Sequence, residues 1–120
     1  MTPKIIYMTN IDRRYFMMRR ALDELIADGE MSASSQVVKT EDSSVWSASW
    51  EEKLRGSALV MIRFMGNTIR TKFWTACMHF LSREGIPYYM DAAGSAAEEC
   101  VERVAAKDIA AMKAYSFYGG

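Results

Sequence analysis

Apolar residues follow two different periods along this chain, and the two periods predict strands that alternate with helices. Short, nearly continuous apolar runs predict strands buried on both faces. Apolar residues in steps of three and four predict helices with one buried face. The predicted strands are Lys4–Thr9, Gln36–Thr40, Ala58–Phe64 and Pro87–Met90. The predicted helices are Ile11–Asp28, a short helix that carries Trp46, Trp50 and Leu54 and ends near Gly56, Thr68–Glu84 and Lys107–Phe117.

Glycines and serines indicate where these helices begin and end. Gly29 and Gly85 follow two of the helical stretches, and glycine readily adopts the left-handed conformation that closes a helix. Ser49 and Ser95 are each followed three residues later by a glutamate. That spacing matches the capping box, in which the two side chains satisfy free N–H groups at a helix start. The second box predicts a further helical stretch before residue 107.

Strands that alternate with helices form βαβ units, which give a parallel sheet with right-handed crossovers. We therefore expect an α/β fold, a three-layer sandwich of the flavodoxin-like or Rossmann-like kind. Its four-stranded parallel sheet should have the strand order 2-1-3-4. At 120 residues and 13.6 kDa, the chain is expected to form a single α/β domain over residues 1–120.

Composition and charge exclude several classes of protein. Half of the residues are apolar and 25% are charged, which argues against disorder and coiled coils. The formal net charge is zero, so no nucleic acid is expected as a partner drawn by bulk charge. The apolar runs are too short for a membrane span, and the N-terminus lacks the apolar core of a signal peptide. Two cysteines 23 positions apart suit neither a redox pair nor a zinc site. We expect a cytoplasmic protein with reduced cysteines.

Several familiar active sites are missing from the sequence. The turn after the first strand, Thr9–Arg14, has no glycine, whereas dinucleotide-binding folds need a glycine-rich turn there. The third strand ends in Arg63 and Phe64 rather than in the aspartate of a phosphoacceptor domain. His79, the only histidine, falls on the polar side of its helix, and Cys77 on the apolar side. We expect no catalytic residue and no metal site; a surface histidine and a core thiol are the simplest interpretations.

The distribution of charge is more informative than its sum. No acidic residue occurs from Lys53 to Arg83, although six basic residues do. Cations also stand in the first turns of two helices, where they oppose the helix dipole. In a 2-1-3-4 sheet, the loops after strands one and three flank the crevice where such folds bind ligands. The candidate residues of an anionic crevice are Thr9, Asn10, Arg13, Arg14, Arg63, Gly66, Arg70 and Lys72. The alternatives are a docking face for another domain, or solvated charges partly paired with Asp12 or Asp91.

Some large apolar residues lie outside the predicted buried stripes. They are either the edges of broad core faces or an apolar surface that contacts more protein. These residues are Phe16, Met17, Trp74, Phe117 and Tyr118.

The chain resembles the N-terminal domain of the large subunits of cobaltochelatase and magnesium chelatase. The resemblance rests on ALVMIRFMG, the tryptophan-containing helix after it, REGIPYYMDAAG and the closing AYSFYGG. The first strand with its Thr-Asn turn also fits. Met65–Asn67 replaces the family's paired glycines and Asp91–Gly94 its longer loop, and Glu30–Ser49 has no match. Cobalt and magnesium subtypes therefore both stay open.

The resemblance implies a non-catalytic fragment of a much longer subunit that inserts a divalent metal into a tetrapyrrole. It implies as partners the remaining domains of that subunit, its ATPase subunits and the tetrapyrrole. It implies no cofactor in this domain, with ATP and magnesium used by the full complex. The alternative is a free-standing flavodoxin-like module for signalling or protein interaction. An enzyme in its own right would need His79 or Cys77 in a pocket with a perturbed pKa.

Overall fold

Strands and helices alternate along the chain as the hydrophobic pattern predicts. The computed structural model describes residues 2–40, 45–65, 71–93 and 107–114. Within these ranges the chain forms seven bounded elements and, over residues 107–114, a last helix. The elements are β1 (Ile5–Thr9), α1 (Asp12–Ala27), β2 (Gln36–Lys39), α2 (Ala48–Leu54), β3 (Leu59–Met65), α3 (Thr71–Arg83) and β4 (Tyr88–Ala93).

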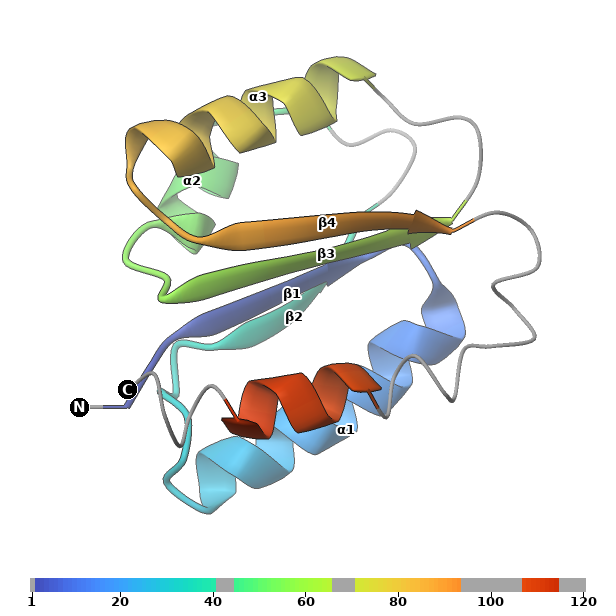
Figure 1. Ribbon diagram of the computed structural model, residues 1–120, viewed down its shortest axis with the longest axis vertical. Helices are drawn as coiled ribbons and strands as arrows, with labels where there is room; N and C mark the ends of the chain where they lie inside the picture. Colours follow the sequence, from blue (N-terminus) through green and yellow to red (C-terminus); the bar gives the residue numbers. More distant parts are fainter. Residues whose placement is uncertain (1, 41–44, 66–70, 94–106, 115–120) are drawn as a thin grey trace.

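The strands form one parallel sheet between two layers of helices. The strand order is β2-β1-β3-β4, and every neighbouring pair is parallel. The helix over residues 107–114 lies beside α1 on one face, and α2 and α3 cover the other (Figure 1). The predicted α/β class and parallel sheet are therefore confirmed. β4 continues beyond the predicted opening Pro87–Met90 to Ala93, because residues 91–93 pair with Arg63–Met65 of β3.

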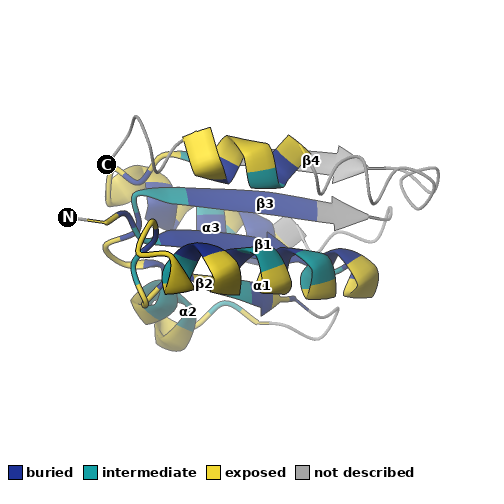
Figure 2. Cartoon of the chain, turned by 90° about the horizontal axis from the view of Figure 1, so that it is seen from below, coloured by how far each residue is buried: buried dark blue, intermediate teal, exposed yellow. Residues whose placement is uncertain are grey.

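Each face of the sheet carries its own hydrophobic core, which explains why the central strands read as continuous apolar runs. Ile5, Tyr7 and Met61 contribute to the core under α1. Ile6 and Ile62 contribute to the core under α2 and α3. Figure 2 shows the middle strands buried along most of their length, while the helices are exposed on their outer sides.

Backbone geometry at the helix ends agrees with the predicted glycine stops. Gly29 has a φ of 77° and Gly85 a φ of 69°, in the region where glycine is favoured. After α1, the N–H of Glu30 donates to the carbonyl of Leu25 at 2.9 Å. This bond and the one from the N–H of Gly29 to Ile26 form the closing motif that satisfies the last carbonyls of a helix.

The predicted capping box at Ser49 is wrong. α2 begins at Ala48, so Ser47 is its cap, and no side chain makes the capping hydrogen bond. The preceding tryptophan fixes the start of the helix instead. Trp46 donates from its indole Nε1 to Glu51 at 3.1 Å and stacks on Trp50 with ring centroids 6.4 Å apart. The box at Ser95 lies outside the described residues.

Two large aromatic residues off the predicted stripes have opposite environments. Trp74 is only 7% exposed and packs edge-on against Phe73, with ring centroids 4.9 Å apart. It therefore belongs to the core under α2 and α3, which extends to the edge of the apolar face of α3. Phe16 is 65% exposed. Met17 is half-buried against the core under α1, and Phe117 and Tyr118 lie outside the described residues.

Cys77 should be unreactive in the folded protein. Its side chain is buried in the core, and burial raises the pKa of the thiol from 9.0 to about 12. In a Cys100→Ser variant, a thiol reagent at pH 8 should therefore label Cys77 only as fast as the chain unfolds. Rapid labelling under native conditions would contradict its buried position.

The stability of the chain should also depend on the thiol proton of Cys77. Above pH 9 the unfolded chain loses this proton and the folded chain keeps it. As the pH rises above 9, Cys77 should therefore lower the free energy of unfolding by up to about 1.4 kcal/mol per pH unit.

Candidate functional site

The carboxyl ends of β1 and β3 lie side by side, and the helices that follow them cover opposite faces of the sheet. Thr9, the last residue of β1, is in register with Arg63 of β3. The chain continues from β1 into α1 on one face, whereas α3, the helix after β3, covers the other (Figure 1). Such a topological switch point is where open α/β sheets bind ligands. The sequence-predicted crevice corresponds to this edge of the sheet.

A buried ion pair joins β3 to the helix over residues 107–114. Arg63 donates from Nη2 to Oδ1 of Asp108 at 2.9 Å and from Nε to Oδ2 at 3.1 Å. Tyr7 of β1 donates its hydroxyl to the same Oδ2 at 2.6 Å. Arg63 is 6% exposed, and Asp108 is fully buried. One carboxylate thus connects two central strands to the last helix, with the paired geometry that makes arginine–carboxylate contacts strong.

Tyr7 is held as a neutral hydrogen-bond donor. Burial raises the pKa of its phenol, and the hydrogen bond to Asp108 and the negative charge of Asp108 raise that pKa further. The positive charges of Arg14 and Arg63 act on the phenol in the opposite direction. Both guanidinium groups are therefore close enough to Tyr7 to influence its ionisation, although burial outweighs them.

Arg14 is a buried cation without a full set of hydrogen bonds. It is 1% exposed, and its Nε and Nη2 have no hydrogen-bond partner. It occupies the buried stripe of α1, where it precedes Met18, Leu22 and Leu25. A guanidinium is always charged at physiological pH, and a buried charge without a partner costs several kcal/mol. Two donor nitrogens of Arg14 consequently have unused hydrogen-bonding capacity in the interior.

Arg14 and Arg63, two residues of the predicted anionic crevice, are both buried. Arg63 lies on the same face of β3 as Met61, which packs in the core under α1. Arg14 lies one helical turn before Met18 on the buried face of α1. Arg13 and Lys72 are exposed in the first turns of α1 and α3. Thr9 is buried and accepts a hydrogen bond on Oγ1 from the N–H of Ile11 at 3.2 Å.

The other predicted site residues are less informative. Asn10 is half-buried. Gly66 and Arg70 lie outside the described residues. Sequence reasoning missed Tyr7 and Asp108. The usable signal was the arginine in the apolar run ALVMIRF, because a cation in a buried strand needs a carboxylate from elsewhere.

Three of the described basic residues between Lys53 and Arg83 have local partners. Acids that flank this stretch in sequence approach its cations in space: Arg55 lies 3.5 Å from Glu84, and Arg83 lies 3.6 Å from Glu51. Lys53 lies over the ring of Trp50, 5.0 Å from its centroid. These contacts fit the alternative of surface charges with local partners. Asp12 likewise pairs with a cation, Lys39 of β2.

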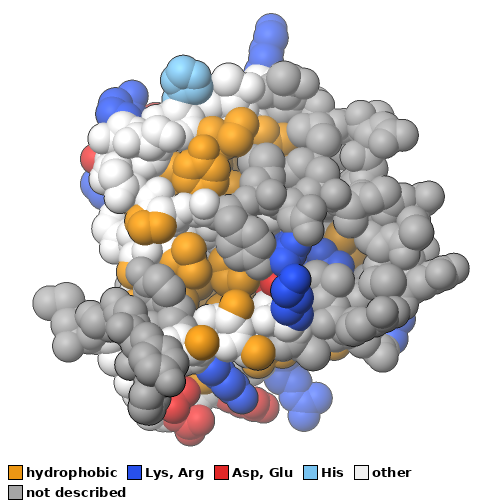
Figure 3. Space-filling view, in the orientation of Figure 1, with side chains coloured by type: hydrophobic (Ala, Val, Ile, Leu, Met, Phe, Trp, Pro, Cys, Tyr) orange, Lys and Arg blue, Asp and Glu red, His pale blue; other side chains and the backbone are white. Residues whose placement is uncertain are grey.

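The described residues contain few groups suited to catalysis. His79 is exposed on α3 (Figure 3), and Cys77 is a core thiol. Within residues 2–40, 45–65, 71–93 and 107–114, no three His, Cys, Asp or Glu side chains are placed to hold a metal ion. None of the helices in these ranges is long and apolar enough to cross a membrane.

Comparison with known proteins identifies no relative. The chain matches no family model, no curated protein and no solved structure.

Proposed function

We propose that this chain is a non-catalytic, anion-binding domain of a metal chelatase large subunit, and that its ligand is a carboxylate of the tetrapyrrole. The observation that carries the proposal is Arg14, a buried guanidinium with two nitrogens that lack hydrogen-bond partners, near the topological switch point. Tetrapyrrole substrates carry several carboxylates, and a carboxylate matches the forked donors of arginine.

Arg14 is the residue that would bind the ligand. The Nε and Nη2 of Arg63 already donate to Asp108, so the role of Arg63 in this proposal is structural. The Nε and Nη2 of Arg14 are adjacent donors of one planar group and would each contact one oxygen of a bound carboxylate. Desolvation would strengthen these bonds, because a charge-assisted hydrogen bond gains in a medium of low dielectric constant.

The rest of the assignment extends from the same resemblance. The strand order β2-β1-β3-β4 supports a flavodoxin-like architecture, in which ligands bind at this edge of the sheet. In the proposed complex, metal insertion takes place in the remaining domains of the subunit. The ATPase subunits use ATP and magnesium, and the assembly works in the cytoplasm.

A titration with a polycarboxylate porphyrin tests the proposal. Uroporphyrin added to the chain should give a saturable change in its absorption spectrum. Arg14→Met should weaken the affinity by about tenfold or more, since a hydrogen bond to a charged group contributes about 1.5–3 kcal/mol. Arg83→Met is the matched control, because Arg83 is exposed at the far end of α3. Its affinity should equal that of the parent chain.

Two results would contradict direct binding. The first is an unchanged spectrum at high micromolar porphyrin. The second is equal weakening by Arg14→Met and Arg83→Met, which would indicate a nonspecific charge effect.

A protein-interaction module is the second candidate function, and the exposed Phe16 on α1 favours it. Whether the reading frame continues past Gly120 separates the two candidates. A long continuation favours the chelatase subunit, and a stop codon favours the module.

A further inference from the structure

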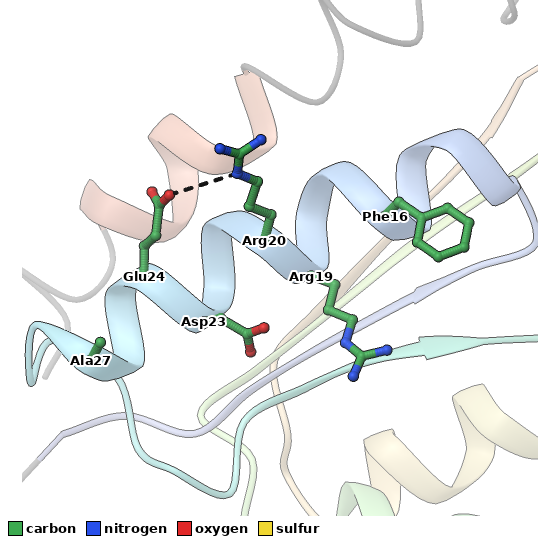
Figure 4. Close-up of a pocket in the computed structure, with 6 residues that line it drawn as sticks. All are labelled: Phe16, Arg19, Arg20, Asp23, Glu24 and Ala27. Atoms are coloured by element: carbon green, nitrogen blue, oxygen red, sulfur yellow. Dashed lines mark ion pairs between the residues drawn. The ribbon is translucent and has the colours of Figure 1, made fainter.

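The outer surface of α1 carries an apolar hollow between charged side chains. Its volume is about 480 Å³, and Figure 4 shows its side chains arranged along the helix. We call this surface the α1 patch. It consists of Phe16, Arg19, Arg20, Asp23, Glu24 and Ala27. Among the large apolar residues that the structure describes, only Phe16 and Val45 are exposed.

The charges of the α1 patch are poorly arranged for the helix itself. Arg20 lies 4.0 Å from Glu24, and both side chains are more than two-thirds exposed, so this ion pair contributes little. Its order, cation before anion, is also the weaker one for residues four apart. The stability of α1 by itself therefore does not explain why two arginines and then two acids follow the exposed Phe16.

The α1 patch is complementary to itself. When a second copy of the helix packs antiparallel to the first, with the centre of the patch between residues 21 and 22, each position n lies level with position 43 − n of the other copy. The arginines of each copy then face the acids of the other, and Phe16 faces Ala27. Arg20 and Glu24 lie along one side of the helix and Arg19 and Asp23 along the other (Figure 4). A two-fold axis preserves these sides, so opposite charges meet in both rows.

We propose that the α1 patch is a pairing surface for a second copy of this chain, with the two α1 helices packed antiparallel about a two-fold axis. A two-fold interface uses the same patch on both subunits and must be self-complementary. Phe16 of each copy covers Ala27 of the partner subunit, a large side chain over a small one. Each copy contributes two arginines and two acids, which form cross-subunit ion pairs at the rim. This proposal does not depend on the ligand proposed for Arg14.

The contact consists of one helix face, so the dimer is expected to be weak. Stable interfaces bury about 1,200–2,000 Å² in total, and a single helix crossing falls below that range. The fraction of dimer should therefore depend on protein concentration. It should also fall as salt is added, because rim ion pairs are screened.

Sedimentation equilibrium over a range of protein concentrations tests the dimer. The parent chain should show a reversible monomer–dimer equilibrium at high concentration. Arg19→Glu with Arg20→Glu makes every charge of the patch acidic, and Asp23→Arg with Glu24→Arg makes every charge basic. Each double variant alone should dimerise at least about tenfold more weakly, because like charges then face each other. An equimolar mixture of the two should associate again.

Phe16→Ser and a surface control complete the experiment. Phe16→Ser should also weaken the dimer, without changing the patch charges. Glu52→Arg, a charge reversal on α2, should leave it unchanged, and circular dichroism should confirm that every variant is folded. A parent chain that stays monomeric at all concentrations would overturn the proposal. Persistent dimers in both double variants, or no association in their mixture, would overturn it as well.

Discussion

Asp108→Asn should lower the free energy of unfolding by about 3–5 kcal/mol, the usual cost of breaking a buried ion pair from one side. The variant keeps the shape of the side chain and removes its charge. Arg63 then keeps a buried positive charge without the carboxylate that accepts its two hydrogen bonds. Urea denaturation followed by circular dichroism measures the loss.

Two further variants separate the charge of Asp108 from its position. Asp28→Asn removes an exposed carboxylate at the end of α1, and its stability should stay within about 0.5 kcal/mol of the parent. Arg63→Met combined with Asp108→Leu removes both charges and should be more stable than either single replacement. A loss of less than about 1 kcal/mol in Asp108→Asn would show that the ion pair contributes little.

Arg14→Met should raise the free energy of unfolding by about 1–4 kcal/mol, as replacement of buried charges by apolar residues of similar volume often does. Methionine fits the buried stripe that Arg14 shares with Met18 and Leu22. It also removes the two nitrogens that lack hydrogen-bond partners. Thermal and urea denaturation of both proteins in chloride buffer measure the gain.

Added anions should change the stability of the parent chain and of the Arg14→Met variant to different extents. Uroporphyrin, or an excess of a simple dicarboxylate, should stabilise the parent chain and leave Arg14→Met unchanged, because a ligand stabilises only the form that binds it. Arg83→Met should respond as the parent chain does. A destabilised Arg14→Met variant would mean that Arg14 is satisfied in solution and is not available to a ligand.

The hydrophobic pattern predicts the strands well because both faces of the sheet are covered. Ala58–Phe64, for example, differs by one residue at each end from the observed β3. The glycine stops are equally local signals and were also predictable. The start of α2 was not, because only Ser49 is followed three residues later by a glutamate, yet Ser47 is the observed cap. The contact between Trp46 and Glu51 distinguishes them, and it depends on the core under α2 and α3.

The candidate site was predictable only in part. Periodicity places Tyr15 on the stripe of α1, yet Arg14 is the buried residue and Tyr15 is half-buried. The long side chain of Arg14 can extend from that position toward the end of the sheet. A search for apolar residues does not detect a buried arginine of this kind. Asp108 was beyond prediction because its partner Arg63 is 45 residues away. Short-range sequence patterns do not indicate which polar residue of a surface helix has its side chain buried.

The long separation between Asp108 and its partners has a consequence for synthesis on the ribosome. Tyr7 precedes Asp108 by 101 residues, so β1, α1 and β3 emerge well before the carboxylate that neutralises Arg63. Domains fold as units once their chain is available, and contacts this distant are formed late because their loop closure is costly. A chain that stops before residue 107 therefore lacks the carboxylate of Asp108 beside Arg63, and synthesis of the helix over residues 107–114 supplies it. The ion pair makes the native fold conditional on synthesis of the helix over residues 107–114, and chains terminated before this helix remain unstable substrates for degradation.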